Sequence, residues 1–206
     1  WLLATIEDLK DEERLATLHD ALSAELEIRR DKLLLLVSFL FPSVVMLDTR
    51  ANIDSKVQEL RVFALEILDN LLTGDIKQIV LPLLDDLTVA ERLEMMSARF
   101  PQQRMSAEAR FNDVVEQHFD RAFFWTRSCL LMQIGIDRSA AHLDQVHSAL
   151  HDREAIIRET ALWSLARIDP EETRQHIGGF VDDANAQVRG VARAIRDELP
   201  APDPAS

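Results

Sequence analysis

Hydrophobic residues recur along this chain at the spacing of helix faces. The stretch 56–73 carries apolar residues at offsets of 0, 3, 4, 7, 8 and 11, namely Leu60, Phe63, Ala64, Ile67, Leu68 and Leu71. The stretch 75–87 repeats these offsets from Ile76 to Leu87. A stripe of this period predicts an amphipathic α-helix with one buried face. Because Gly74 can end a helix, the two stretches together predict a helical hairpin.

Similar patterns predict helices along most of the chain. They cover residues 12–41, 56–73, 75–87, 89–100, 107–119, 122–135, 140–151, 154–168, 171–181 and 186–199. Residues 1–11 are interpreted as the tail of a preceding helix or a linker, and residues 43–54, after a helix stop at Pro42, as a loop. The apolar run 33–41 is shorter than the ~20 residues of a membrane span, so we expect a buried helix there.

One unit of sequence occurs twice near the end of the chain. Asp152, Arg158 and Ala161 return 31 residues later as Asp183, Arg189 and Ala192. Backward steps from Arg158 lead to Arg127 and, after a four-residue insertion, to Arg92, Arg61 and Arg30. This period is typical of stacked helix-pair solenoids, whose single pairs cannot bury their apolar faces alone.

The repeat therefore predicts the fold class and the domain plan. We expect an all-α, right-handed α-α superhelix of about five or six antiparallel helix pairs. Residues 1–199 are predicted to form one repeat domain, with the clearest repeats at 54–100 and 140–199. Residues 200–206 are predicted to be a flexible tail or linker.

Composition supports a folded helical domain and narrows the partners. The 206 residues are 47% hydrophobic and 29% charged, with only five Gly and seven Pro, which favours helix over sheet. The net charge of −13 argues against nucleic acid and anionic membrane surfaces, and it permits a basic protein segment as partner. One cysteine, Cys129, cannot form an internal disulfide, so we expect a reducing compartment, the cytoplasm, and a buried thiol.

The repeated motif resembles the HEAT and HEAT-like repeats. Their hallmark is an Asp-containing turn, then an apolar residue followed by Arg, then Ala three residues on; here it is found around Arg158 and Arg189. Residues 64–87 and 125–135 are similar to the HEAT region of bacterial proteins that join an ATP/ADP-translocase-like membrane domain to helical repeats and often to a cyclic-nucleotide-binding domain. This resemblance implies the regulatory part of a larger membrane protein, tethered to the inner membrane through a missing domain, with Trp1 and 200–206 at domain edges.

Five of the six repeat arginines have an aspartate six or seven residues upstream. The pairs are Asp54 with Arg61, Asp86 with Arg92, Asp120 with Arg127, Asp152 with Arg158 and Asp183 with Arg189. Two interpretations are open for this series. The arginines can line a groove for acidic ligands, or they can form a structural ladder with the aspartates between stacked repeats, which we favour because an unpaired buried charge is costly.

Candidate chemistry is sparse. Asp144, His147 and His151, at i, i+3 and i+7, would project from one side of a helix and are the best metal candidate, but no ligand from a second helix is identifiable. No cofactor is expected. The leading hypothesis is a non-enzymatic scaffold that binds a protein, such as an adjoining domain of its own polypeptide. The alternatives are an enzyme on the same architecture, bilin lyase-like, glycosylase-like or metal-dependent, and an interdomain lever without a separate ligand.

Overall fold

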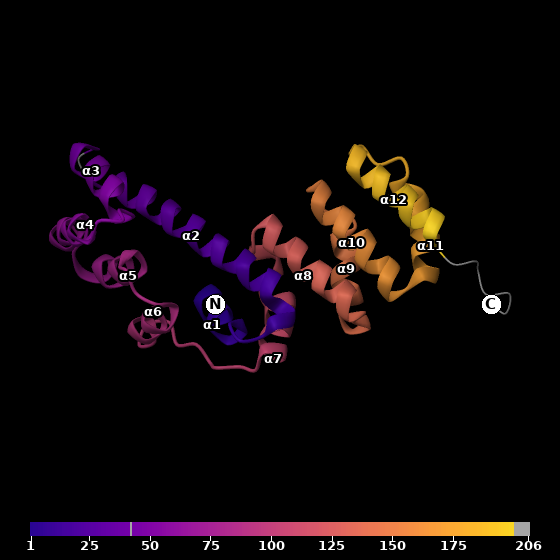
Figure 1. The fold of residues 1–206 in the computed structure, drawn as a ribbon, viewed down its shortest axis with the longest axis horizontal. Coiled ribbons are helices and arrows are strands. Elements are labelled where there is room, and N and C mark those ends of the chain that lie inside the picture. Colours follow the sequence, from indigo (N-terminus) through magenta and orange to yellow (C-terminus); the bar gives the residue numbers. More distant parts are fainter. Residues whose placement is uncertain (42, 200–206) are drawn as a thin grey trace. The chain divides into compact units, whose positions relative to one another are not determined.

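The part of the chain that the structure describes is entirely helical, which confirms the all-α prediction. The computed structural model describes residues 1–41 and 43–199, and these form twelve α-helices and no strand (Figure 1). The predicted stop at Pro42 and the predicted tail at 200–206 lie outside the described residues. The helices are α1 (Leu2–Leu9), α2 (Ala16–Ser38), α3 (Ser43–Ile53), α4 (Gln58–Leu71), α5 (Gly74–Leu84), α6 (Val89–Met96), α7 (Ala107–Asp113), α8 (Phe124–Asp137), α9 (Leu143–Ala149), α10 (Ala155–Ile168), α11 (Pro170–Phe180) and α12 (Ala186–Glu198).

Short tight turns join some of these helices. Glu13–Leu15, Phe119–Arg121 and Ala140–His142 are 3₁₀ turns, and Val114–His118 is a π turn that continues α7. The chain divides into two compact units. Unit 1 comprises residues 1–11 and 22–106, and unit 2 comprises residues 12–21 together with the chain from residue 107 onward.

In unit 2, α10 lies between α8 and α12, while α9 and α11 pack against it (Figure 1). The contact between α8 and α10 is close because α8 has no side chain at Gly135, where a Cβ would lie 2.8 Å from the Cα of Ser164. Ser164 in turn donates a hydrogen bond of 2.7 Å to the carbonyl of Leu131 on α8. The fully buried core side chains of these three helices are Leu130, Leu131, Ile134, Ile157, Ala161, Leu162, Leu165, Val188 and Ala192.

In unit 1, α3 packs against α4, α5 contacts both α4 and α6, and α1 packs against α6. Its main hydrophobic core is formed by Leu34, Val37, Met46, Ile53, Ala64, Leu68, Leu72, Val80 and Leu84. Helix α1 buries Leu2, Ile6 and Leu9, so residues 1–11 belong to a folded helix of this unit.

Local sequence accounts for several helix ends. Thr88 and Glu91 form a capping box at the start of α6. Asp169 caps α11 by accepting from the N–H of Glu172, and Pro170 occupies the first helical position. Asn185 caps α12 through its side-chain oxygen. These caps fix the residues at which α6, α11 and α12 begin.

The predicted loop at 43–54 is wrong, because residues 43–53 form α3. Its buried face is short and includes a polar residue, namely Met46, Thr49 and Ile53. Thr49 satisfies its buried hydroxyl by donating to the carbonyl of Val45, one turn earlier. An apolar stripe that contains threonine does not stand out in a search for hydrophobic periodicity, although the threonine is fully compatible with a buried helix face.

Candidate functional site

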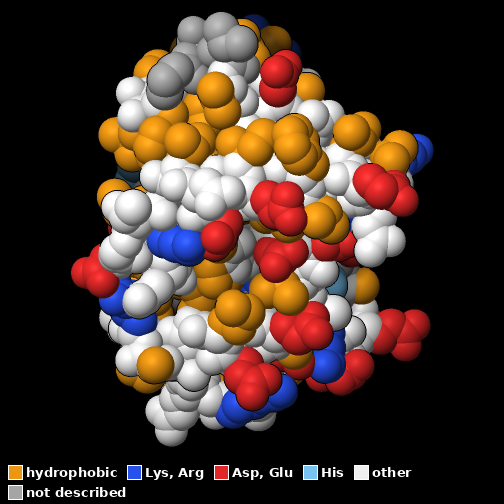
Figure 2. Space-filling model, turned by 90° about the vertical axis from the view of Figure 1, so that its left-hand side faces the viewer, with side chains coloured by type: hydrophobic (Ala, Val, Ile, Leu, Met, Phe, Trp, Pro, Cys, Tyr) orange, Lys and Arg blue, Asp and Glu red, His pale blue; other side chains and the backbone are white. Residues whose placement is uncertain are grey.

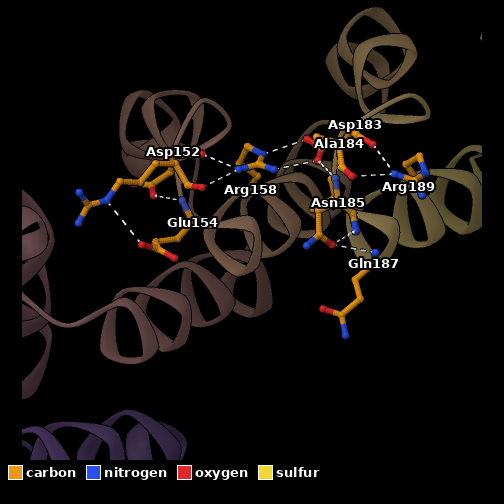
Figure 3. A network of polar contacts seen from close by, with 10 residues as sticks. Asp152, Glu154, Arg158, Asp183, Ala184, Asn185, Gln187 and Arg189 are labelled. Carbon is orange, nitrogen blue, oxygen red and sulfur yellow. Dashed lines mark hydrogen bonds and ion pairs between the residues drawn. The ribbon is translucent and has the colours of Figure 1, made fainter.

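A network of polar contacts surrounds Arg158 in unit 2 (Figure 3). Its guanidinium donates two parallel hydrogen bonds to the carboxylate of Asp183, of 2.9 and 2.8 Å. It also donates to the backbone carbonyls of Asp152 and Arg153, at 2.8 and 3.1 Å. Both charged side chains are mostly buried, 16% and 11% exposed. A two-point arginine–carboxylate pair of this kind holds its geometry strongly.

The network corrects the expected pairing within the motif. We expected each arginine to pair with the aspartate six or seven residues upstream, but Arg158 contacts Asp152 only through its backbone carbonyl. Its carboxylate partner lies 25 residues downstream, in the turn of the following helix pair. Arg189 likewise donates to the carbonyls of Asp183 and Ala184 in its own turn. Each arginine thus binds its own turn through carbonyls, and Arg158 also binds the next turn through a carboxylate.

The same downstream pairing links Arg127 to Asp152. The guanidinium of Arg127 also lies 4.7 Å from the ring centre of Phe119. Burial raises the pKa of Asp152, but the N–H of Glu154 and the guanidinium of Arg127 outweigh it, so the pKa lies below its ordinary value. The pKa of Asp183 is also lowered, chiefly by its hydrogen bonds from Arg158. Both carboxylates are therefore held in the charged form.

The motif arginines of unit 1 have weaker partners. Arg61 makes a single 3.0 Å contact with Asp86, whose side chain is 75% exposed. Arg92 donates to the carbonyl of Asp85 at 2.9 Å and has no carboxylate partner among the described residues. Asp54 of this unit is exposed and forms no ion pair within the described part of the chain, and the same holds for Asp120 in unit 2. In unit 1, the predicted ladder of aspartate–arginine pairs is therefore incomplete.

The candidate metal ligands do not converge. Helix α9 ends at Ala149, so His151 lies in the turn beyond it, and the prediction that Asp144, His147 and His151 project from one side of one helix is wrong. The Nε2 atom of His147 lies 3.0 Å from a carboxylate oxygen of Glu172. Among the described residues, no group of three or more His, Cys, Asp or Glu side chains could hold a metal ion.

Cys129 is buried in α8, as the sequence predicts. Burial raises the pKa of its thiol to about 11. A thiol with this pKa is almost entirely protonated near neutral pH, and the thiolate is the form that attacks substrates. Cys129 therefore acts as a small apolar side chain of the core.

Helices α4 and α5 border a broad groove in unit 1. Its volume is about 730 Å³, and it is lined by Val62, Leu65, Glu66, Asp69, Asn70, Leu81 and Asp85. Its apolar side chains therefore stand beside three carboxylates. Asp69 pairs with Lys77 at 2.8 Å, whereas Glu66 has no cationic partner among the described residues. Such a surface suits a ligand that is both apolar and positively charged.

Exposed hydrophobic side chains continue this surface. Figure 2 shows them as a band on the side of unit 1 that carries α3, α4 and α5, with carboxylates beneath it. The expected buried stripe of α4 is rotated, because Ala64 and Leu68 are buried while Phe63 is 54% exposed. The large hydrophobic residues exposed on α2 to α5 are Ile28, Leu35, Leu36, Val45, Leu47, Leu60, Val62, Phe63 and Ile76.

Sequence reasoning did not identify this groove. The signal was present in the spacing of Val62, Glu66 and Asp69, which places apolar and acidic side chains along one side of α4. It was masked by the stronger stripe that includes Leu60 and Phe63. More than half of the residues of α4 are apolar, so periodicity alone does not decide which of them face the core.

Two further findings bear on identity. Among the described residues, no helix is both long and apolar enough to cross a membrane. No protein-family model, no curated protein and no solved structure matches this sequence.

Proposed function

We propose that this chain is a non-catalytic helical-repeat scaffold whose α4–α5 groove binds an apolar, basic protein segment. The observation that carries the proposal is the combination of a concave apolar surface with three carboxylates in its lining. An amphipathic helix is a suitable occupant, since its apolar face can cover Val62, Leu65 and Leu81. Lysine or arginine side chains at the edge of that face would then meet Glu66 and Asp85.

The charge of the whole chain favours the same partner. A net charge of −13 raises the rate at which a basic segment meets the surface and discourages acidic ones. The exposed apolar side chains of α3 and α4 extend the area that an occupant can cover (Figure 2). Large exposed apolar patches on a folded protein mark interaction surfaces.

The proposal also includes the repeat architecture and its setting. The downstream pairing of 25 residues recurs at Arg61, Arg127 and Arg158, which supports repeated HEAT-like units in a right-handed superhelix. The partner segment would belong to an adjoining domain, such as a cytoplasmic loop of a translocase-like membrane domain in the same polypeptide. The scaffold would then lie in the cytoplasm, tethered to the inner membrane through that domain.

A binding titration tests the proposal. The probe is a labelled synthetic helix with leucine on one face and lysine on its flanks, and its fluorescence anisotropy is followed as the full chain is added. We expect saturable binding that weakens as salt rises, because the attraction between exposed charges is screened. Glu66→Gln should weaken binding about threefold to fivefold, the effect of one exposed charge pair.

Glu59→Gln is the matched control. Glu59 lies on the same helix and is exposed, but it does not line the groove. The two variants lose the same charge, so a partner attracted only by net charge would respond equally to both. Equal responses, or the absence of saturable binding by the unmodified chain, would contradict the proposal.

A further inference from the structure

A second pocket of unit 1 has the opposite charge character. It has a volume of about 240 Å³ and is lined by the turn between α3 and α4, by Leu65 and Leu84, and by charged side chains from α2, α4, α6 and the α5–α6 turn. The charged residues that line it are Arg30, Lys56, Arg61, Arg92, Asp54 and Asp86. Four cations against two carboxylates leave a net charge of +2 in a chain whose total is −13.

Arg92 is the least compensated of these cations. Its side chain is buried, with the residue only 7% exposed. One guanidinium nitrogen donates to the carbonyl of Asp85. The Nε atom is buried without a hydrogen-bond partner, and the described residues offer Nη1 no acceptor either. Burial lowers the pKa of Arg92, and the neighbouring charge of Arg30 lowers it further. A buried guanidinium without a carboxylate partner is costly and is stabilised by an anion.

The other two arginines are already held in place. Arg30 donates to the carbonyls of Leu83 and Leu84, at 2.8 and 3.3 Å, where α5 ends. It also donates to the carboxylate of Glu27, which lies outside the lining, at 2.5 Å. Arg61 donates to the carbonyl of Ser55 at 2.8 Å and to Asp86 at 3.0 Å. These contacts limit the rotamers of both side chains before any ligand arrives. A preorganised set of cations loses less side-chain entropy on binding an anion.

We propose that this pocket binds a dianionic phosphate group, free or as the monoester of a small molecule. The lining holds more cations than carboxylates, and arginine guanidinium groups donate several hydrogen bonds to phosphate oxygens at once. The turn that precedes α4 brings Lys56 to the pocket, where it has no ion-pair partner among the described residues. This pocket shares only Leu65 with the lining of the α4–α5 groove and has the opposite charge, so the site does not depend on the proposed function.

The test uses the full chain and inorganic phosphate as the probe. Isothermal titration with phosphate, against chloride at the same ionic strength, measures whether phosphate binds saturably. Lys56 and Asp54 are exposed residues of the pocket lining, and substituting them changes the charge of the pocket in opposite directions. Lys56→Gln should weaken phosphate binding about threefold to fivefold, whereas Asp54→Asn should strengthen it by a similar factor, because one removes an attractive charge and the other a repulsive one.

Lys32→Gln, an exposed change of the same charge on α2, is the control and should leave the affinity unchanged. A second titration with glycerol 2-phosphate distinguishes the two sources: comparable affinity supports a monoester ligand, and binding of inorganic phosphate alone supports the free ion. Phosphate heats no larger than those of chloride would overturn the proposal. So would equal weakening by Lys56→Gln and Lys32→Gln, because that result would show only the loss of overall charge.

Discussion

The repeat arginines of the two units occupy equivalent places in the sequence but have different surroundings. In unit 2, Arg158 makes four hydrogen bonds, two to Asp183 and two to carbonyls. In unit 1, Arg61 reaches one exposed carboxylate and Arg92 none among the described residues. The motif arginine Arg158 of unit 2 thus uses its donors for internal contacts, while Arg92 of unit 1 keeps donors that a ligand could use.

The exposed hydrophobic residues are divided in the same way. Of the large hydrophobic side chains that are exposed in the described part of the chain, fourteen lie in unit 1 and three in unit 2, the latter being Phe124, Trp125 and Ile136. Unit 2 also has the close helix contact at Gly135. Unit 2 therefore has the features of a stable structural element, and unit 1 those of a binding surface.

The largest effect that separates the units is expected from the arginines. Arg158→Ala should lower the free energy of unfolding by ~3–5 kcal/mol, because it leaves the mostly buried Asp183 carboxylate without its partner. Arg61→Ala should lower it by only ~0–1 kcal/mol, because Asp86 is exposed to water. Denaturant melts of both variants measure this. Equal losses would show that the two pairs do not differ.

A smaller loss is expected where α8 meets α10. Gly135→Ala places a Cβ 2.8 Å from the Cα of Ser164 and 2.9 Å from a ring carbon of Trp163, so the helices must move apart. We expect a loss of ~1–3 kcal/mol in thermal or denaturant unfolding. The control is Gly190→Ala on α12, where no atom lies within 4 Å of the added Cβ. A Gly135→Ala variant as stable as this control would exclude a tight α8–α10 contact.

The free energy of unfolding should also depend on pH through Asp183 of unit 2. The pKa of Asp183 is lowered in the folded state, so the unfolded chain binds the proton more readily. The free energy of unfolding therefore rises with pH between the lowered pKa of the folded state and the ordinary carboxyl pKa. The contribution is present above the ordinary carboxyl pKa and is lost as pH falls through the lowered one. Unfolding free energies measured from about pH 6 to pH 3 should therefore decline less steeply in Asp183→Asn than in the unmodified chain. Identical slopes would mean that Asp183 does not contribute.

The smallest effect on stability is expected on the surface of unit 1. Phe63→Ser changes a side chain that is 54% exposed, so the free energy of unfolding should change by less than about 1 kcal/mol. The same denaturant melt on Ala64→Ser, at a fully buried neighbour, should show a larger loss. A large loss in Phe63→Ser would place Phe63 in the core, as the periodic stripe had suggested.

The sequence predicted most of the helices and part of the candidate site. The helices around Arg158 and Arg189 follow from their repeated spacing and caps, because those signals are local. The identity of the arginine partner did not follow, since the contact to Asp183 depends on how successive turns stack rather than on distance along the chain. The outward face of α4 was also missed. Because α4 has apolar residues on several sides, the sequence does not show which side faces the core.

The central claim is that unit 1 provides the binding surface, and a residue-resolved titration tests it most directly. The full, isotope-labelled chain is titrated with the leucine–lysine helix while its backbone amide resonances are recorded. We predict that the shifts concentrate on α4 and on the C-terminal half of α5, around Glu66 and Leu81, with α10 and α12 unchanged. Shifts of similar size on α10 and α12, or none on α4, would contradict the account.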